Sequence, residues 1–156
     1  RRASCERVAK VLGQEFLRGA TMDQLEAVKD RISEEDYLRA RYVIGEEKRV
    51  LDVCEALGKG DYETVGARMY ETHWGMSKDY EVSCEELDFL ATVAKECGVT
   101  GSRIMGGGFG GCTINLVKAE LYDAFIEKAK SAFAEKYGHE PVVIPVVISD
   151  GARKLA

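Results

Sequence analysis

The stretch GSRIMGGGFGGCTINLV, residues 101–117, contains six glycines within its first eleven positions. The segments SRIM and CTINLV lie on either side of the main glycine cluster and include apolar and β-branched residues. Short segments of this kind favour β-strands. The stretch therefore predicts two strands joined by a glycine-rich loop. A loop with so few side chains raises the question of which group packs against its backbone.

The glycine spacing matches a nucleotide-binding pattern only in part, because Gly106, Gly108 and Gly111 satisfy G-x-G-x-x-G. A dinucleotide-binding loop needs a helix directly after the third glycine, where the pyrophosphate binds, whereas the strand-like CTINLV follows here. A Walker loop needs G-K-[ST], but Cys112 comes next, and the protein-kinase strings H-R-D and D-F-G do not occur. We therefore reject these three interpretations.

Other roles for the glycines follow from their missing side chains. Without Cβ atoms, backbone N–H groups can converge on an anion, or another loop can lie directly against the backbone. A tight hairpin that only needs unusual dihedral angles is a further interpretation, and the sequence leaves these open. The loop's one charge is Arg103 at its edge, so a bound anion would find most of its countercharge elsewhere.

Upstream of this stretch, the sequence predicts helices with recognisable ends. Thr21 precedes Gln24 by three residues, which is the spacing of a capping box, and Ser83 precedes Glu86 in the same way. A first helix is expected from Ser4 to a stop at Gly13, and others over 21–32, 33–60, 61–76 and 83–98.

The two longest of these helices have Ser33 and Asp61 as candidate N-caps. Apolar residues recur along one face of the first at helical spacing: Tyr37, Ala40, Ile44, Leu51 and Cys54. We expect these two helices and the helix over 21–32 to pack as antiparallel neighbours.

Downstream, residues 119–138 predict another helix, and PVVIPVVIS, residues 141–149, predicts a strand. Pro145 cannot donate a ladder hydrogen bond, which restricts that strand to an edge or a bulge. The order of elements predicts an α+β fold with a small, mainly antiparallel sheet covered by helices. No repeat or linker divides the sequence, so we expect one domain over residues 1–156.

Composition limits the function classes. The formal net charge is −5 and 46% of residues are hydrophobic, which argues against nucleic acid or an anionic membrane as a partner. The five cysteines form no C-x-x-C pair and neither histidine lies near a cysteine pair, so we expect no zinc site and buried free thiols in a cytoplasmic protein. These residues are Cys5, Cys54, Cys84, Cys97, Cys112, His73 and His139.

Several polar residues could suggest a site. His73 next to Trp74 is expected to be a packed histidine rather than a catalytic one. An acidic group could suggest Mg²⁺ ligation; its members are Asp79, Glu81, Glu85, Glu86 and Asp88. Capping and surface charge are the preferred interpretation for Glu85 and Glu86, Asp79 and Tyr80 are expected to hold the turn into the next helix, and no metal site is expected. Arg103 could serve either a structural salt bridge or an anchor near an active site.

Residues 101–117 also resemble the third signature of the galactose, homoserine, mevalonate and phosphomevalonate (GHMP) kinase superfamily. THWGMSKDYEVSCEELD, residues 72–88, is similar to the segment that galactokinases carry upstream of it. RARYVIGEEKRV, residues 39–50, and the RR-x-x-CE pattern at residues 1–6 resemble galactokinase segments as well. The resemblance extends over essentially the whole chain in the correct order.

The resemblance implies the C-terminal half of a galactokinase, with an α+β, ferredoxin-like domain. Such enzymes use ATP and Mg²⁺ to phosphorylate galactose at C1, and galactose and ATP would bind mainly through the other half. No tightly bound cofactor and no catalytic residue are expected in this chain. The residues implied to support the phosphate-binding loop are Ser102, Arg103, Gly106, Gly107, Gly108, Gly110 and Gly111.

The chain also departs from the family pattern. The sugar-binding string G-R-x-N-L-I-G-E-H and the triphosphate-binding string P-x-x-x-G-L-S-S-S-A do not occur, so we expect this polypeptide alone to be inactive and to be a piece of a longer protein. Met105 stands where galactokinases commonly have Thr or Ser. A non-catalytic, galactose-responsive sensor of the same fold is the alternative, whereas DYEVSCEELD argues against another GHMP kinase.

Overall fold

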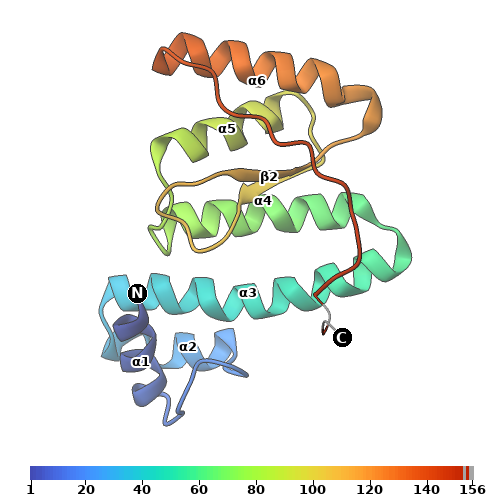
Figure 1. Cartoon of the computed structure of the whole chain (residues 1–156). Coiled ribbons are helices and arrows are strands. Elements are labelled where there is room, and N and C mark those ends of the chain that lie inside the picture. The colour runs from blue at the N-terminus through green and yellow to red at the C-terminus, as the bar shows by residue number, and fades with distance from the viewer. Residues whose placement is uncertain (153, 155–156) are drawn as a thin grey trace.

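A computed structural model describes residues 1–152 and 154, and Figure 1 shows a mainly helical chain with one hairpin. The elements in order are α1 (Arg2–Val11), α2 (Met22–Ala27), η1 (Lys29–Arg31), α3 (Glu34–Lys59), α4 (Tyr62–Lys78), α5 (Glu85–Glu96), β1 (Gly101–Ile104), β2 (Thr113–Leu116), η2 (Ala119–Leu121) and α6 (Tyr122–Tyr137). The predicted α+β fold class is confirmed.

Local capping chemistry fixes three helix starts, those of α2, α3 and α4, where the sequence predicts them. Thr21 and Gln24 form a reciprocal capping box at α2. The Ser33 hydroxyl accepts the Asp36 amide at the start of α3, and Asp61 caps α4. These side chains satisfy amide donors that the first helical turn leaves free.

The start of α5 differs from the prediction. The helix begins at Glu85 with Cys84 as its N-cap, and no side chain caps it. The hydroxyl of Ser83, the expected cap, instead donates to Asp88 Oδ1 at 2.5 Å. This tertiary network takes the serine away from the helix end.

The elements stack in layers around α4. In Figure 1, α3 lies on one side of α4 and the hairpin on the other, with α5 and α6 beyond the hairpin. The strands pair antiparallel, with Ile104 opposite Thr113 and Gly101 opposite Leu116. The hairpin therefore lies between helical layers, as the predicted helix-covered sheet requires.

Glycines allow β1 to approach the backbone of α4. A Cβ atom on Gly66 would lie 1.9 Å from the carbonyl oxygen of Thr100, and one on Gly101 would lie 2.6 Å from Gly66 Cα. Neither distance is possible for real carbon atoms, so the helix and the strand touch backbone to backbone only because both positions are glycine.

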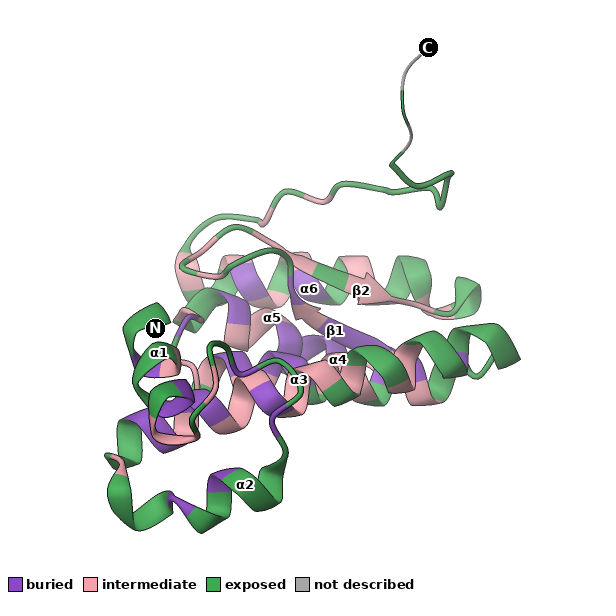
Figure 2. Ribbon diagram, turned by 90° about the horizontal axis from the view of Figure 1, so that it is seen from below, coloured by how far each residue is buried: buried purple, intermediate pink, exposed green. Residues whose placement is uncertain are grey.

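Buried apolar residues form three clusters along the stack (Figure 2). The first joins α1, the loop after it, α2 and the first half of α3; the second joins α5 and α6; the third lies beneath the hairpin. The buried members of the third cluster are Met76, Val82, Leu87 and Ile104. This third cluster is the floor of the glycine loop.

The predicted strand over residues 141–149 is wrong, because these residues pair with no other strand. The described sheet thus has two strands. Aliphatic side chains of this segment are exposed: Val142, Ile144, Val146, Val147 and Ile148. Figure 2 shows the end of the segment extending away from the folded elements.

The predicted apolar face of α3 is confirmed only in its first half. Tyr37, Ala40 and Ile44 are buried, but Leu51 is 66% exposed and Cys54 is also exposed. The buried apolar cluster that joins α1 and α2 to α3 reaches along α3 only as far as Ile44. Among the described residues, no helix is both long and apolar enough to span a membrane.

Candidate functional site

The glycine-rich loop joins β1 to β2 and spans residues 105–112. The amide of Met105 donates to the carbonyl of Cys112 at 3.0 Å and closes the loop at its base. Five of the six residues from Gly106 to Gly111 have positive φ, and Gly107 is the exception. Positive φ is easily adopted by glycine and costly for other residues, so most of these glycines are required by the loop's own conformation.

Phe109 is the non-glycine residue of the loop with positive φ, at 62°. Its amide donates to the carbonyl of Val82 at 2.6 Å, and its ring is 75% exposed. Backbone strain at a non-glycine residue persists where surrounding contacts enforce it, and it gathers at functional sites. Here the enforcing contact comes from Val82, 27 residues upstream.

Gly108 is the point where that contact excludes a side chain. A Cβ atom there would lie 2.2 Å from the Val82 carbonyl oxygen and 2.8 Å from Val82 Cβ. Val82 itself is buried. The glycine loop therefore rests against another loop, which is one of the interpretations that the sequence left open.

The remaining loop glycines face open space. A Cβ atom at Gly106, Gly107, Gly110 or Gly111 would meet nothing within 4 Å. Within the described part of the chain, the amides of these residues donate to no protein acceptor. Free amides on an exposed loop are available to an anion or to a second backbone. Gly107 has neither a positive φ nor a close neighbour, so nothing in this chain demands glycine there.

The segment opposite the loop is a tight turn, residues 80–82, between α4 and α5. Its amides are held by α4, since Tyr80 donates to the Gly75 carbonyl and Val82 to the Met76 carbonyl, both at 2.9 Å. Glu81 has a positive φ of 52°. Two strained non-glycine residues, Glu81 and Phe109, thus lie on either side of the contact at Val82.

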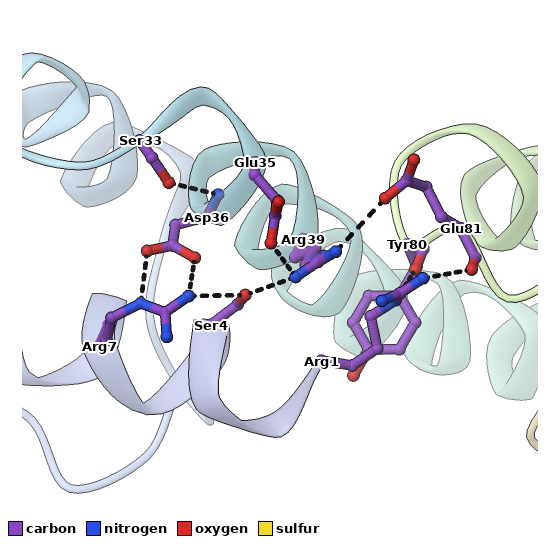
Figure 3. Close-up of polar contacts among 9 residues, drawn as sticks. All are labelled: Arg1, Ser4, Arg7, Ser33, Glu35, Asp36, Arg39, Tyr80 and Glu81. Carbon is purple, nitrogen blue, oxygen red and sulfur yellow. Dashed lines mark hydrogen bonds and ion pairs between the residues drawn. The ribbon is translucent and has the colours of Figure 1, made fainter.

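Two arginines hold the same turn from the other side (Figure 3). The Arg1 guanidinium donates to the carbonyls of Tyr80 and Glu81, each at 2.5 Å. Arg39 is nearly buried; it donates to Ser4 Oγ at 2.9 Å and lies 3.4 Å from the Glu81 carboxylate. A pair between Arg39 and Glu35 completes this set of contacts.

A polar cluster of the buried His73 and three half-buried side chains lies behind the turn. Asp88 accepts hydrogen bonds from Ser77 at 2.6 Å and from Ser83 at 2.5 Å, and its Oδ1 lies 3.2 Å from Nε2 of His73. Burial lowers the pKa of His73, and the Asp88 carboxylate opposes that shift only in part. His73 is thus a packed histidine that is neutral near pH 7.

The predicted site residues occupy two environments. The six loop positions other than Ser102 lie at the exposed hairpin end or its edge, and Arg103 donates to the Ile104 carbonyl at 3.1 Å. Ser102 is fully buried in β1, and its hydroxyl has no hydrogen-bond partner within the described residues. Met105 is 53% exposed at the entry to the loop.

Arg1, Arg39 and Val82 are the residues that reasoning from the sequence missed. Each lies far along the chain from the loop, and no spacing rule connects them to it. The nearest signal was the string DYEVSC, in which the two residues Tyr80 and Glu81 carry the clamped carbonyls. Among residues 1–152 and 154, no group of three or more His, Cys, Asp or Glu side chains could hold a metal ion.

The helix-covered hairpin with this loop defines the class of protein. The family profile described as GHMP kinases C terminal matches residues 54–137, more than half of the chain. The chain belongs to this family and represents its C-terminal domain.

Within the family, the similar proteins are galactokinases, which confirms the resemblance seen in the sequence. The chain is 43% identical to galactokinase from Homo sapiens, over 99% of this chain and 39% of that protein. It is 42% identical to galactokinase from Clostridium acetobutylicum, over 99% of this chain and 41% of the relative. The chain thus spans less than half the length of the curated relatives it matches.

A solved structure has the same fold. The crystal structure of Lactococcus lactis galactokinase complexed with galactose matches with a TM-score of 0.81 and 32% identity. The match covers 89% of this chain and 36% of that one.

Proposed function

We propose that this chain is the C-terminal domain of a galactokinase that transfers the γ-phosphoryl group of ATP to the C1 hydroxyl of galactose. The support from relatives is that galactokinases from animals and bacteria match almost the full length of the chain. The similar Lactococcus lactis structure contains galactose. The active site would lie between this domain and a first half that supplies the sugar-binding and triphosphate-binding strings.

The free amides of the glycine loop are the observation that carries the proposal. Phosphoryl transfer depends on positioning the phosphates and stabilising their charge rather than on covalent chemistry by the protein. The exposed amides of Gly106 and Gly107 have no acceptor in the described chain. They can donate to a phosphate oxygen or to the backbone of a phosphate-binding loop.

The cofactor requirements divide between this chain and the rest of the enzyme. MgATP supplies the phosphoryl group and part of the countercharge when it is bound. The loop amides fit a phosphate, but the described residues offer no metal-binding cluster. We therefore assign the Mg²⁺ ligands to the nucleotide and to residues outside this chain, and we propose that the 156-residue chain alone is inactive. A cytoplasmic location stays a prediction.

The test is to produce this chain together with the polypeptide encoded directly upstream of Arg1 and to measure ADP release. We expect release that depends on galactose with the two parts together and none with this chain alone. Galactose binding without ADP release would favour the sensor instead, and a start codon at Arg1 would contradict the proposal.

A loop variant makes that assay specific. Gly107→Ala adds a methyl group where this chain has open space, so it should leave folding intact and still lower the rate of ADP release. Gly58→Ala in α3 also meets nothing within 4 Å and serves as the matched control. Equal activity of the two variants would argue against a site at the glycine loop.

A further inference from the structure

We propose that Arg1 is a positioning residue that sets the conformation of the glycine loop through the 80–82 turn, with Arg39 in a supporting role. Arg1 makes no hydrogen bond to the loop itself. Its side chain donates to two carbonyls of the turn, and the turn passes the constraint on through the Val82 carbonyl.

The first step is that the turn needs an external donor. Helix α4 satisfies the amides of Tyr80 and Val82, but the carbonyls of Tyr80 and Glu81 point to the Arg1 guanidinium instead. The positive φ of Glu81 is disfavoured for a side chain of that type. A planar guanidinium with two parallel donors fixes the orientation of both carbonyls, which a single ammonium group cannot do.

The second step links the turn to the loop. The next carbonyl in the turn, that of Val82, accepts the Phe109 amide at 2.6 Å and lies where a Cβ atom of Gly108 would be. A rotation of the turn would therefore move this acceptor against the loop. Arg1 also lies 6.0 Å from the centroid of the Phe109 ring, so the same guanidinium borders both sides of the contact.

Arg39 supports the turn from α3. Its guanidinium lies 3.4 Å from the Glu81 carboxylate while it also donates to Ser4 Oγ. Ser4 belongs to α1, the helix that Arg1 caps. Arg39 thus connects Ser4 of α1, its own helix α3 and Glu81 of the turn.

The amide of Phe109 offers a readout that does not depend on activity. With ¹⁵N-labelled phenylalanine, hydrogen exchange at Phe109 reports the contact with Val82, while Phe125 in α6 reports global unfolding. In Arg1→Ala we expect exchange at Phe109 to rise at least about tenfold, the change expected from losing one hydrogen bond to a charged group. Exchange at Phe125 should stay within about twofold, because a local opening leaves other segments protected.

The matched control is the adjacent arginine. Arg2 is 92% exposed in its side chain and, among the residues that the structure describes, pairs only with Glu6, so Arg2→Ala should leave Phe109 exchange unchanged. Arg1→Lys keeps the positive charge but lacks the two parallel donors of the guanidinium, so it should give a hydrogen-exchange rate at Phe109 between those of wild type and Arg1→Ala. Unchanged exchange in Arg1→Ala, an equal rise in Arg2→Ala, or a parallel rise at Phe125 would each overturn the inference.

The effect of Arg1 on phosphoryl transfer is a prediction that rests on the proposed function. In the reconstituted two-part enzyme, Arg1→Ala should lower kcat while leaving the KM for galactose unchanged, and Arg1→Lys should recover part of kcat. A rise in the KM for galactose with kcat unchanged would count against the positioning role. If the wild-type pair shows no activity, the proposed function fails, whereas the exchange experiment still decides the role of Arg1.

Discussion

Gly108→Ala tests directly whether the glycine loop is held by close contact with the 80–82 turn. Two costs add. A side chain at φ +87° costs about 1–2 kcal/mol in the left-handed region. The new Cβ atom would lie 2.2 Å from the Val82 carbonyl oxygen, so the loop must move away and lose the Phe109 hydrogen bond, which contributes about 1 kcal/mol.

The expected result is a loss of about 2–3 kcal/mol in the free energy of unfolding, summed from these two costs. The loss of stability stays in this range because the whole loop can move away from Val82 and so avoid a steric clash. Urea unfolding followed by circular dichroism measures it, with an unchanged slope against denaturant as the condition for comparison. Gly107→Ala is the control, because its position has open space, and it should stay within about 0.5 kcal/mol of wild type.

A loss below about 0.5 kcal/mol for Gly108→Ala would refute the reasoning, since surface substitutions without a structural role fall in that range. Such a result would mean that the loop is not packed against Val82 in solution. Equal losses for both variants would mean that the loop tolerates no side chain for a reason unrelated to this contact.

Three further predictions concern the rest of the chain. Gly66→Ala should destabilise the fold by about 2 kcal/mol or more, because overpacking against Thr100 outweighs the gain of about 1 kcal/mol in helix propensity. Gly58→Ala, whose new methyl group meets open space, should stabilise the fold instead. Chemical unfolding of both variants checks the sign of each change in the free energy of unfolding. The lowered pKa of His73 means that the unfolded chain binds the proton more readily, so stability should fall as pH decreases below the ordinary histidine pKa of about 6.5. His73→Gln should flatten that dependence in unfolding measured from pH 7 to pH 5, and an unchanged slope would contradict the assignment. The exposed aliphatic residues of 142–148 should promote association of the chain with itself. Removal of residues 141–156 should therefore lower the molar mass measured by light scattering toward that of a monomer. The same degree of association with and without these residues would contradict this prediction.

The helix ends show how far local sequence reaches. The cap residues Ser33 and Asp61 and the capping box at Thr21 were predictable, because each hydrogen bond joins residues three positions apart. The hairpin was predictable because two short strand-like segments lie on either side of the glycines, which is also a local pattern. Ser83 was predicted wrongly as a cap because Ser83 and the half-buried Asp88 form a contact that depends on His73 and Ser77 from another helix.

The candidate site was only half visible in the sequence. The glycines marked the loop, and four of them face open space as an accessible backbone requires. What holds the loop was not visible, because Arg1 and Tyr80 are 79 positions apart. Arg39 and Glu81 are separated by 42 positions, and no periodicity or spacing rule joins residues at such distances.

The sequence by itself determined the main helices, the hairpin and the family, because these depend on short-range hydrogen bonds, periodicity and motif strings. The tertiary structure alone decided which surfaces are covered. Leu51 continues the apolar stripe of α3 but is exposed, and residues 141–149 have a strand-like sequence but no partner. It also decided that Gly66 and Gly108 are needed for contact rather than conformation alone. Burial and close approach depend on which backbone arrives from elsewhere, and that is settled only when the whole chain has folded.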